Sequence, residues 1–152
     1  MSSPTLSSRL VPPIPAVTVT ALGAVATFAL ARVLWPDPAG APTPSADLLP
    51  FFLLLSVAES VVFGLGLAFL AFGLAPLRRA KAGAALTWAA YLSIGFMLLS
   101  WWPHDNMHRV LSHGDFAGLV QIEYLFHAPL IAAAVIVAAF FLRSVGGRRA
   151  DA

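Results

Sequence analysis

Cysteine is absent from this sequence, and charged residues are scarce. Without a thiol, the chain can form no disulfide, no thiolate metal site and no cysteine-ligated iron–sulfur cluster. Only 11% of its residues are charged, whereas soluble domains usually carry about 25%. This scarcity excludes an ordinary soluble domain and indicates a chain that places most of its surface in a lipid bilayer.

Several functional signatures are also missing. The sequence contains no P-loop, no dinucleotide-binding fingerprint and no arrangement typical of a nucleophilic triad, which argues against hydrolase, ATPase and dinucleotide-dependent functions. The net charge of +2 does not indicate nucleic-acid binding, because the basic residues sit in small groups beside apolar runs. Such groups meet anionic lipid headgroups. We therefore expect the lipid bilayer, and no nucleic acid, as a partner.

Long apolar runs make up most of what is present. Each exceeds or approaches the roughly 20 residues that a helix needs to cross a bilayer. The pattern predicts an all-α integral membrane four-helix bundle, formed by a single domain over residues 14–142. The expected helices span about 14–35, 48–77, 82–102 and 116–142, between a disordered tail at 1–13 and a basic C-terminal tail at 143–152. The first run is longer than the apolar core of a signal peptide, which favours an uncleaved helix.

Lysine and arginine placement predicts the orientation of the bundle. With a cytoplasmic N-terminus, seven basic residues lie inside and only Arg32 and Arg109 lie outside. This bias predicts a multi-pass protein of the plasma (inner) membrane with both termini cytoplasmic. Trp35, Trp101 and Trp102 are then expected at the outer interface, as aromatic anchors.

The polar residues of the predicted outer half form an unusual set. The stretch "WWPHDNMHRVLSH" (101–113) carries three of the four histidines and would face the extracytoplasmic side. Glu59 and His127 each lie eleven residues along helices that are entered from that side, which is about 16 Å deep at ~1.5 Å per residue. Intramembrane carboxylates are costly unless they find a partner, so they are expected to face the bundle interior.

The spacing of these residues points to metal binding. Glu123 and His127 are four residues apart and share one helix face. His104 and His108 have the same spacing, and they share a face if "HDNMH" is helical, which Pro103 in a first helical turn would allow. The predicted metal ligands are Glu59, His104, His108, Glu123 and His127, with Asp105 and Met107 as optional or supporting groups. His113 is interpreted as a loop residue, and Asp115 as the cap of the fourth helix.

Histidine and carboxylate without thiol suit copper, zinc or non-haem iron. The nearby methionine and the outward position favour copper over iron or zinc. Haem b is the weaker alternative, because bis-histidine ligation needs two imidazoles that face each other at similar depth. The chain has too few histidines for a membrane hydroxylase and lacks the Glu-x-x-His repeats of di-iron bundles. The sequence predicts a role in metal handling or as a small redox subunit and leaves open whether the chain is an enzyme.

Two other functions fit the same residues. Glu59, Glu123 and His127 could form a proton or ion pathway, since intramembrane ionisable groups commonly serve transport. A small chain without a soluble domain could also be an accessory structural subunit of a larger membrane complex. Small residues recur every four positions in the first helix, at Gly23, Thr27 and Ala31. They permit close helix contacts in the bundle, in a homo-oligomer or with a partner.

Overall fold

The computed structural model describes residues 13–111 and 116–150, and within these ranges the chain is helical without strands. The helices are α1 (Pro13–Leu34), α2 (Leu49–Phe72), α3 (Leu74–Arg78), α4 (Ala84–Leu111), α5 (Phe116–Ile122) and α6 (Ala128–Ala150). A π-helical turn, η1 (Glu123–His127), joins α5 to α6 without a break. This confirms the predicted all-α class.

Four of these segments are long and apolar enough to cross a membrane: Ile14–Leu34, Leu49–Phe72, Ala84–Leu111 and Phe116–Gly146. Many of their large apolar side chains are exposed in the isolated chain, among them Phe51, Leu54, Ile131, Val135 and Leu142. An apolar surface of this extent is stable in lipid and not in water. The fold therefore fits a multi-pass membrane protein, while its orientation and its membrane of residence stay predictions.

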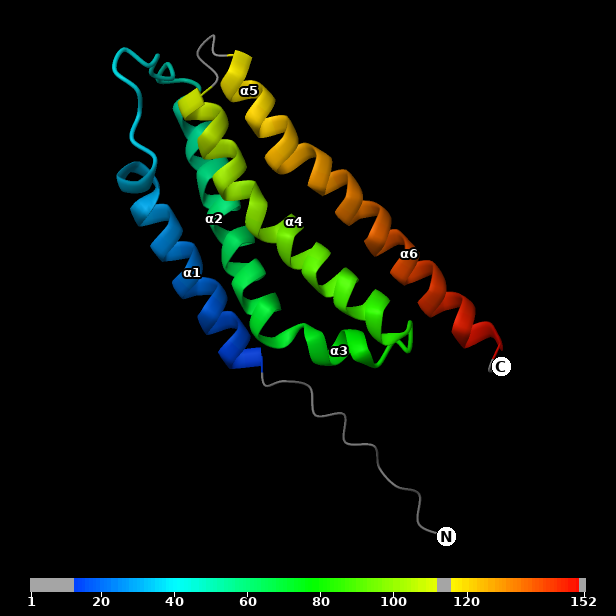
Figure 1. The fold of residues 1–152 in the computed structure, drawn as a ribbon. Helices are drawn as coiled ribbons and strands as arrows, with labels where there is room; N and C mark the ends of the chain where they lie inside the picture. The colour runs from blue at the N-terminus through cyan, green and yellow to red at the C-terminus, as the bar shows by residue number, and fades with distance from the viewer. Residues whose placement is uncertain (1–12, 112–115, 151–152) are drawn as a thin grey trace.

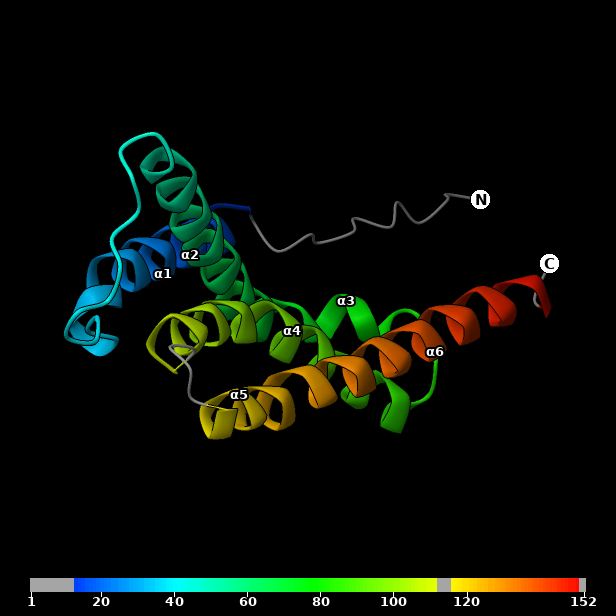
Figure 2. The same ribbon diagram turned by 90° about the horizontal axis from the view of Figure 1, so that it is seen from above.

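The long helices pack in chain order. α1 lies against α2, α2 against α4, and α4 against α6, with α1 and α6 at opposite edges (Figures 1 and 2). α1 begins, α2 ends, α4 begins and α6 ends at the same end of the molecule (Figure 1). The other end therefore holds the C-terminal part of α4 together with the start of α5 and η1.

The contact between α1 and α2 is very close. A Cβ atom placed on Gly64 would lie 2.2 Å from the backbone oxygen of Thr20, and one placed on Gly23 would lie 3.0 Å from the Cα of Gly64. Only glycine allows the two backbones to approach this closely. The predicted small-residue contacts of the first helix are thus made within the bundle.

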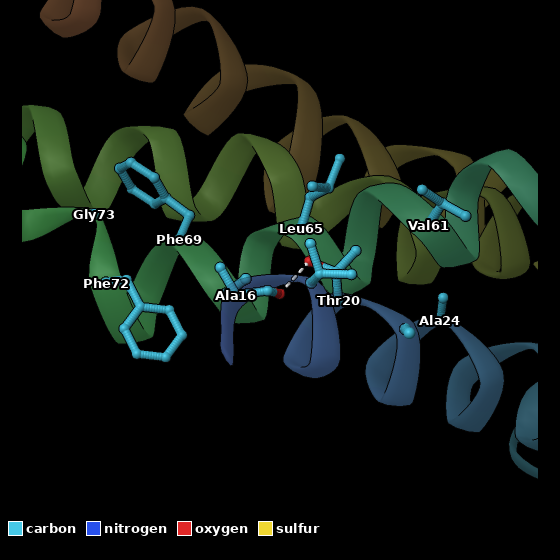
Figure 3. Close-up of a pocket in the computed structure, with 11 residues that line it drawn as sticks. Ala16, Thr20, Ala24, Val61, Leu65, Phe69, Phe72 and Gly73 are labelled. Atoms are coloured by element: carbon cyan, nitrogen blue, oxygen red, sulfur yellow. Dashed lines mark hydrogen bonds between the residues drawn. The ribbon is translucent and has the colours of Figure 1, made fainter. Parts of the chain in front are cut away.

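An open apolar groove of about 530 Å³ runs beside this crossing (Figure 3). Ala16, Thr20 and Ala24 of α1 line one side, and Val61 and Leu65 of α2 line the other. The Thr20 hydroxyl donates to the Ala16 carbonyl oxygen at 2.9 Å, the dashed line in Figure 3. Because that bond occupies the hydroxyl proton, the groove presents an almost entirely apolar surface.

Trp102 lies inside the bundle instead of at the lipid interface. It is 7% exposed, and its ring packs edge-on against Trp35 and Phe63, with ring centroids 6.4 Å and 5.4 Å away. Trp101, the next residue, is 39% exposed. Neighbouring residues of a helix point about 100° apart, so only one of the two tryptophans can face lipid.

Several helix ends differ from the predicted ones. The predicted run 48–77 is divided between α2 and α3, and the predicted helix 82–102 continues to Leu111 as α4. The fourth helix likewise continues past residue 142 to Ala150, through the predicted basic tail. Apolarity marks the part of a helix that can lie in the bilayer. The backbone hydrogen bonds of the helix can continue beyond that part through polar residues, so the helix is longer than its apolar run.

Candidate metal centre

The second half of α4 presents two histidines to the same side. The helix passes through Pro103, which lacks the N–H that an interior residue normally donates, and it remains helical to Leu111. His104 and His108 therefore lie one turn apart, with ring centroids at 4.6 Å. The conditional expectation that "HDNMH" is helical holds in the structure.

The π-helical turn η1 provides the third histidine. The sequence of this turn is "EYLFH", and the Ala128 N–H donates to the Glu123 carbonyl oxygen, five residues back. Pro129 follows directly, and a proline ring clashes with the carbonyl four residues earlier in a regular α-helix. The wider turn relieves this crowding and lies where His127 faces α4. Single π turns of this kind occur frequently at functional sites.

Three imidazoles meet between α4 and η1. The Nε2 atoms of His104 and His127 are 2.9 Å apart, and one ring nitrogen from each of His104, His108 and His127 lies within 4.8 Å of the others. Two nitrogens on one tetrahedral ion with metal–nitrogen bonds of ~2.0–2.1 Å would be about 3.3 Å apart. Small side-chain shifts would therefore bring all three nitrogens onto a single ion.

Glu123 fixes the orientation of His127. The Nδ1 atom of His127 lies 2.7 Å from the Glu123 Oε2 atom, and the two side chains are 37% and 63% exposed. A carboxylate at Nδ1 holds the proton there, which leaves the Nε2 lone pair free to accept or to ligate. His104 then donates from Nε2 to His127, and ligation by His104 requires that proton to move to its Nδ1.

Glu59 is placed elsewhere. Its side chain is buried in α2, at 4% residue exposure, and lies close to the carboxyl group of Asp105 on α4. Within the described ranges, neither carboxylate belongs to the group of side chains that could share one ion with the histidines.

Of the remaining predicted groups, Met107 lies among the described residues. Met107 is half-buried on the α4 turn between His104 and His108. His113 and the predicted cap Asp115 lie outside the described residues. The structure thus brings together three of the five predicted ligands, adds Glu123 as the partner of one of them, and separates Glu59.

Arg109 has a role that the sequence did not reveal. Its guanidinium pairs with Asp37, which also pairs with Arg32, and donates to the Trp35 carbonyl oxygen at 2.6 Å and to the Asn106 Oδ1 at 3.0 Å. These contacts fasten the segment after α1 to the end of α4, one residue beyond His108. The sequence signal for this role was that Arg109 lies between Asp105 and Asp115, in a predicted outer region with few other basic residues.

Comparisons with protein-family models, with curated proteins and with solved structures found no match for this chain.

Proposed function

We propose that this protein binds one transition-metal ion through His104, His108 and His127, and that its function is metal handling in a membrane. The observation that carries the proposal is the meeting of three ring nitrogens within 4.8 Å from two separate helical segments. Imidazoles that only packed against apolar neighbours would have no reason to converge by their nitrogen atoms.

Copper is the preferred ion. Three neutral nitrogen ligands without thiolate suit several divalent metals, and at such a site Cu²⁺ binds most tightly among the common first-row ions. The 2.9 Å between the Nε2 atoms of His104 and His127 is shorter than the roughly 4 Å between two axial imidazoles at ~2.0 Å on opposite sides of a haem iron. The arrangement therefore favours a bare ion over haem b.

The exposure of the site favours transfer of the ion over permanent retention. All three histidines are half-buried, and Glu123 is 63% exposed. Three protein ligands leave at least one coordination position for water or an incoming donor. An ion held in this way can be accepted and passed on, as metal handling requires; a small redox subunit would use the same ligands.

The test is metal analysis of the purified full-length chain in detergent. After separate loading with Cu²⁺, Zn²⁺ and Fe²⁺ and removal of free ions, we expect about one copper per chain and weaker retention of the others. His104→Ala, His108→Ala and His127→Ala should each lower copper affinity by at least the ~10–100-fold that follows loss of a supporting group, because each removes one of the three ligands. Gln121→Ala removes a nearby polar side chain and serves as the matched control. Retention far below one ion per chain, together with no haem absorption band, contradicts the proposal.

A proton pathway is the second candidate, favoured by one specific observation. His104, His127 and Glu123 form a continuous chain of hydrogen bonds, at 2.9 Å and 2.7 Å, from between the helices to an exposed carboxylate. Such chains can carry protons. Liposomes containing the metal-free protein would show a proton flux that His127→Ala abolishes. If the flux equals that of empty liposomes, this candidate is rejected and the metal proposal is unaffected.

A further inference from the structure

The end of the molecule opposite the histidines carries a second feature, at the turn between α3 and α4 (Figure 1). A concave pocket of about 600 Å³ opens there. It is lined by Arg78, Lys81, Gly83, Ala84, Thr87 and Trp88. Its lining is polar and apolar in similar amounts, unlike that of the groove between α1 and α2. None of these residues belongs to the proposed metal site.

The described part of the chain does not neutralise the positive charge of this pocket. Among the described residues, no carboxylate forms an ion pair with Arg78 or Lys81. The sequence contains no acidic residue anywhere between Glu59 and Asp105, whereas Arg79 adds a third cation beside the pocket. Uncompensated basic residues at the edge of a bilayer attract anionic headgroups.

Local structure positions the Arg78 side chain and the backbone of Lys81. The guanidinium carbon of Arg78 lies 5.5 Å from the centre of the Trp88 ring, a cation–π contact that leaves the N–H donors of Arg78 available. Lys81 and Gly83 both have positive φ, 54° and 93°, which turns the chain sharply between α3 and α4. The Thr87 backbone N–H then donates to the Gly83 carbonyl oxygen at 3.0 Å, so the turn leads directly into α4.

An apolar surface continues from the pocket along α4. Trp88 is 44% exposed and Leu92, one turn further into the bilayer, is 61% exposed. Residues four apart lie on one helix face, so the two side chains form a continuous apolar strip that starts at the basic rim. A free phosphate ion would use only the rim, whereas an anionic phospholipid would use the rim and the strip together.

We infer that this pocket binds the headgroup of an anionic phospholipid, with the phosphate between Arg78 and Lys81 and an acyl chain along Trp88 and Leu92. The phosphate chemistry is shared with inorganic phosphate, and the apolar strip decides for the lipid. Such a site holds a lipid at the helix end opposite the metal centre, so either site can fail experimentally while the other is retained.

The experiment is native mass spectrometry of the full chain in detergent, with phosphatidylglycerol and phosphatidylcholine supplied in equal amounts. We expect preferential retention of phosphatidylglycerol by the unmodified protein. Arg78→Gln and Lys81→Gln should each reduce that preference about fivefold, since a basic residue near a charged membrane surface contributes about that factor. Arg78→Lys keeps the charge and should retain most of the preference.

Arg143→Gln is the matched control, because it removes one exposed arginine of α6 that does not line the pocket. Equal retention of the two lipids by the unmodified protein overturns the proposal, as does an equal loss of preference in Arg143→Gln and Arg78→Gln.

In a separate arm, radiolabelled inorganic phosphate replaces the lipid in gel filtration. The unmodified protein could retain phosphate, lose it in Arg78→Gln, and show no preference for phosphatidylglycerol. That result would identify a free-phosphate site and overturn the lipid assignment. Melting temperatures of all variants verify that each is folded.

Discussion

Two helix contacts of this protein are made in opposite ways. Where α1 meets α2, glycine removes the side chains and the backbones touch at Gly23 and Gly64. Where α4 meets η1, imidazole side chains meet by their nitrogen atoms. The first contact depends on shape alone, and neither pH nor a solute should change it. The second places polar groups with free lone pairs between helices, so its strength depends on what is bound there.

The largest expected effect comes from filling the glycine contact. In Gly64→Leu, the new Cβ atom would lie 2.2 Å from the Thr20 carbonyl oxygen, which is backbone and cannot rotate away. We expect a loss of stability at or above the upper end of the ~1–3 kcal/mol typical of overpacking. Thermal unfolding in detergent, followed by circular dichroism, measures it. Gly146→Leu is the control, because a Cβ atom there has nothing within 4 Å. Equal melting temperatures for the two variants would show that the α1–α2 contact is not what the structure indicates.

Acid should act on the histidine contact and leave the glycine contact unchanged. A protonated imidazole cannot ligate, so protons compete with the ion for each of the three histidines. Copper affinity should therefore fall steeply as the pH is lowered from 7.5 to 5. Competition with a chromophoric chelator at each pH measures the change. An affinity that stays constant over this range would contradict ligation by three histidines.

A smaller effect separates the two glutamates. Glu123 holds the Nδ1 proton of His127, and loss of such a partner typically lowers metal affinity about 10–100-fold. Glu123→Gln should show this loss, whereas Glu59→Gln, whose side chain faces Asp105, should stay within about threefold of the unmodified protein. The reverse order would return Glu59 to the ligand set.

The smallest effect concerns the segment between α1 and α2. The Ser45 side chain donates a hydrogen bond to Asp47 and, with the nearby backbone N–H groups, holds the pKa of this carboxyl below its usual value. A lowered folded-state pKa contributes stability above the ordinary value, and that contribution is lost as pH falls through the folded pKa. Ser45→Ala should raise the pKa measured by NMR titration, and it should change the melting temperature only slightly because Asp47 is fully exposed to solvent. A pKa unchanged by Ser45→Ala would contradict the hydrogen bond.

The fold was predictable because bilayer length and apolarity act on whole segments. A run of about 20 apolar residues has few alternatives to a helix in lipid. The ends of the helices were less predictable, since continuation through Pro103 depends on contacts of α4 with its neighbours. The π turn at 123–127 depends on Pro129 and on packing, and neither leaves a clear signal in hydropathy.

The site was predictable only in part, for a reason of geometry. Spacing of four residues correctly placed His104 with His108 and Glu123 with His127, because it fixes which side chains share a face of one helix. Depth gave Glu59 the same level in the bilayer as His127, but depth says nothing about the direction in which a helix faces. The rotation of α2 directs Glu59 to Asp105, and rotation is set by packing at contacts such as Gly64.

The π turn also makes the site sensitive to the number of residues in the chain. A π turn holds one residue more than an α turn, so the face that α6 presents to α4 is offset by about 100° from where an uninterrupted α-helix would place it. Deleting one residue between Glu123 and His127 would restore a regular helix. It would then turn His127 and all of α6 relative to α5. The register of this segment is therefore as much a part of the proposed metal site as the histidines themselves.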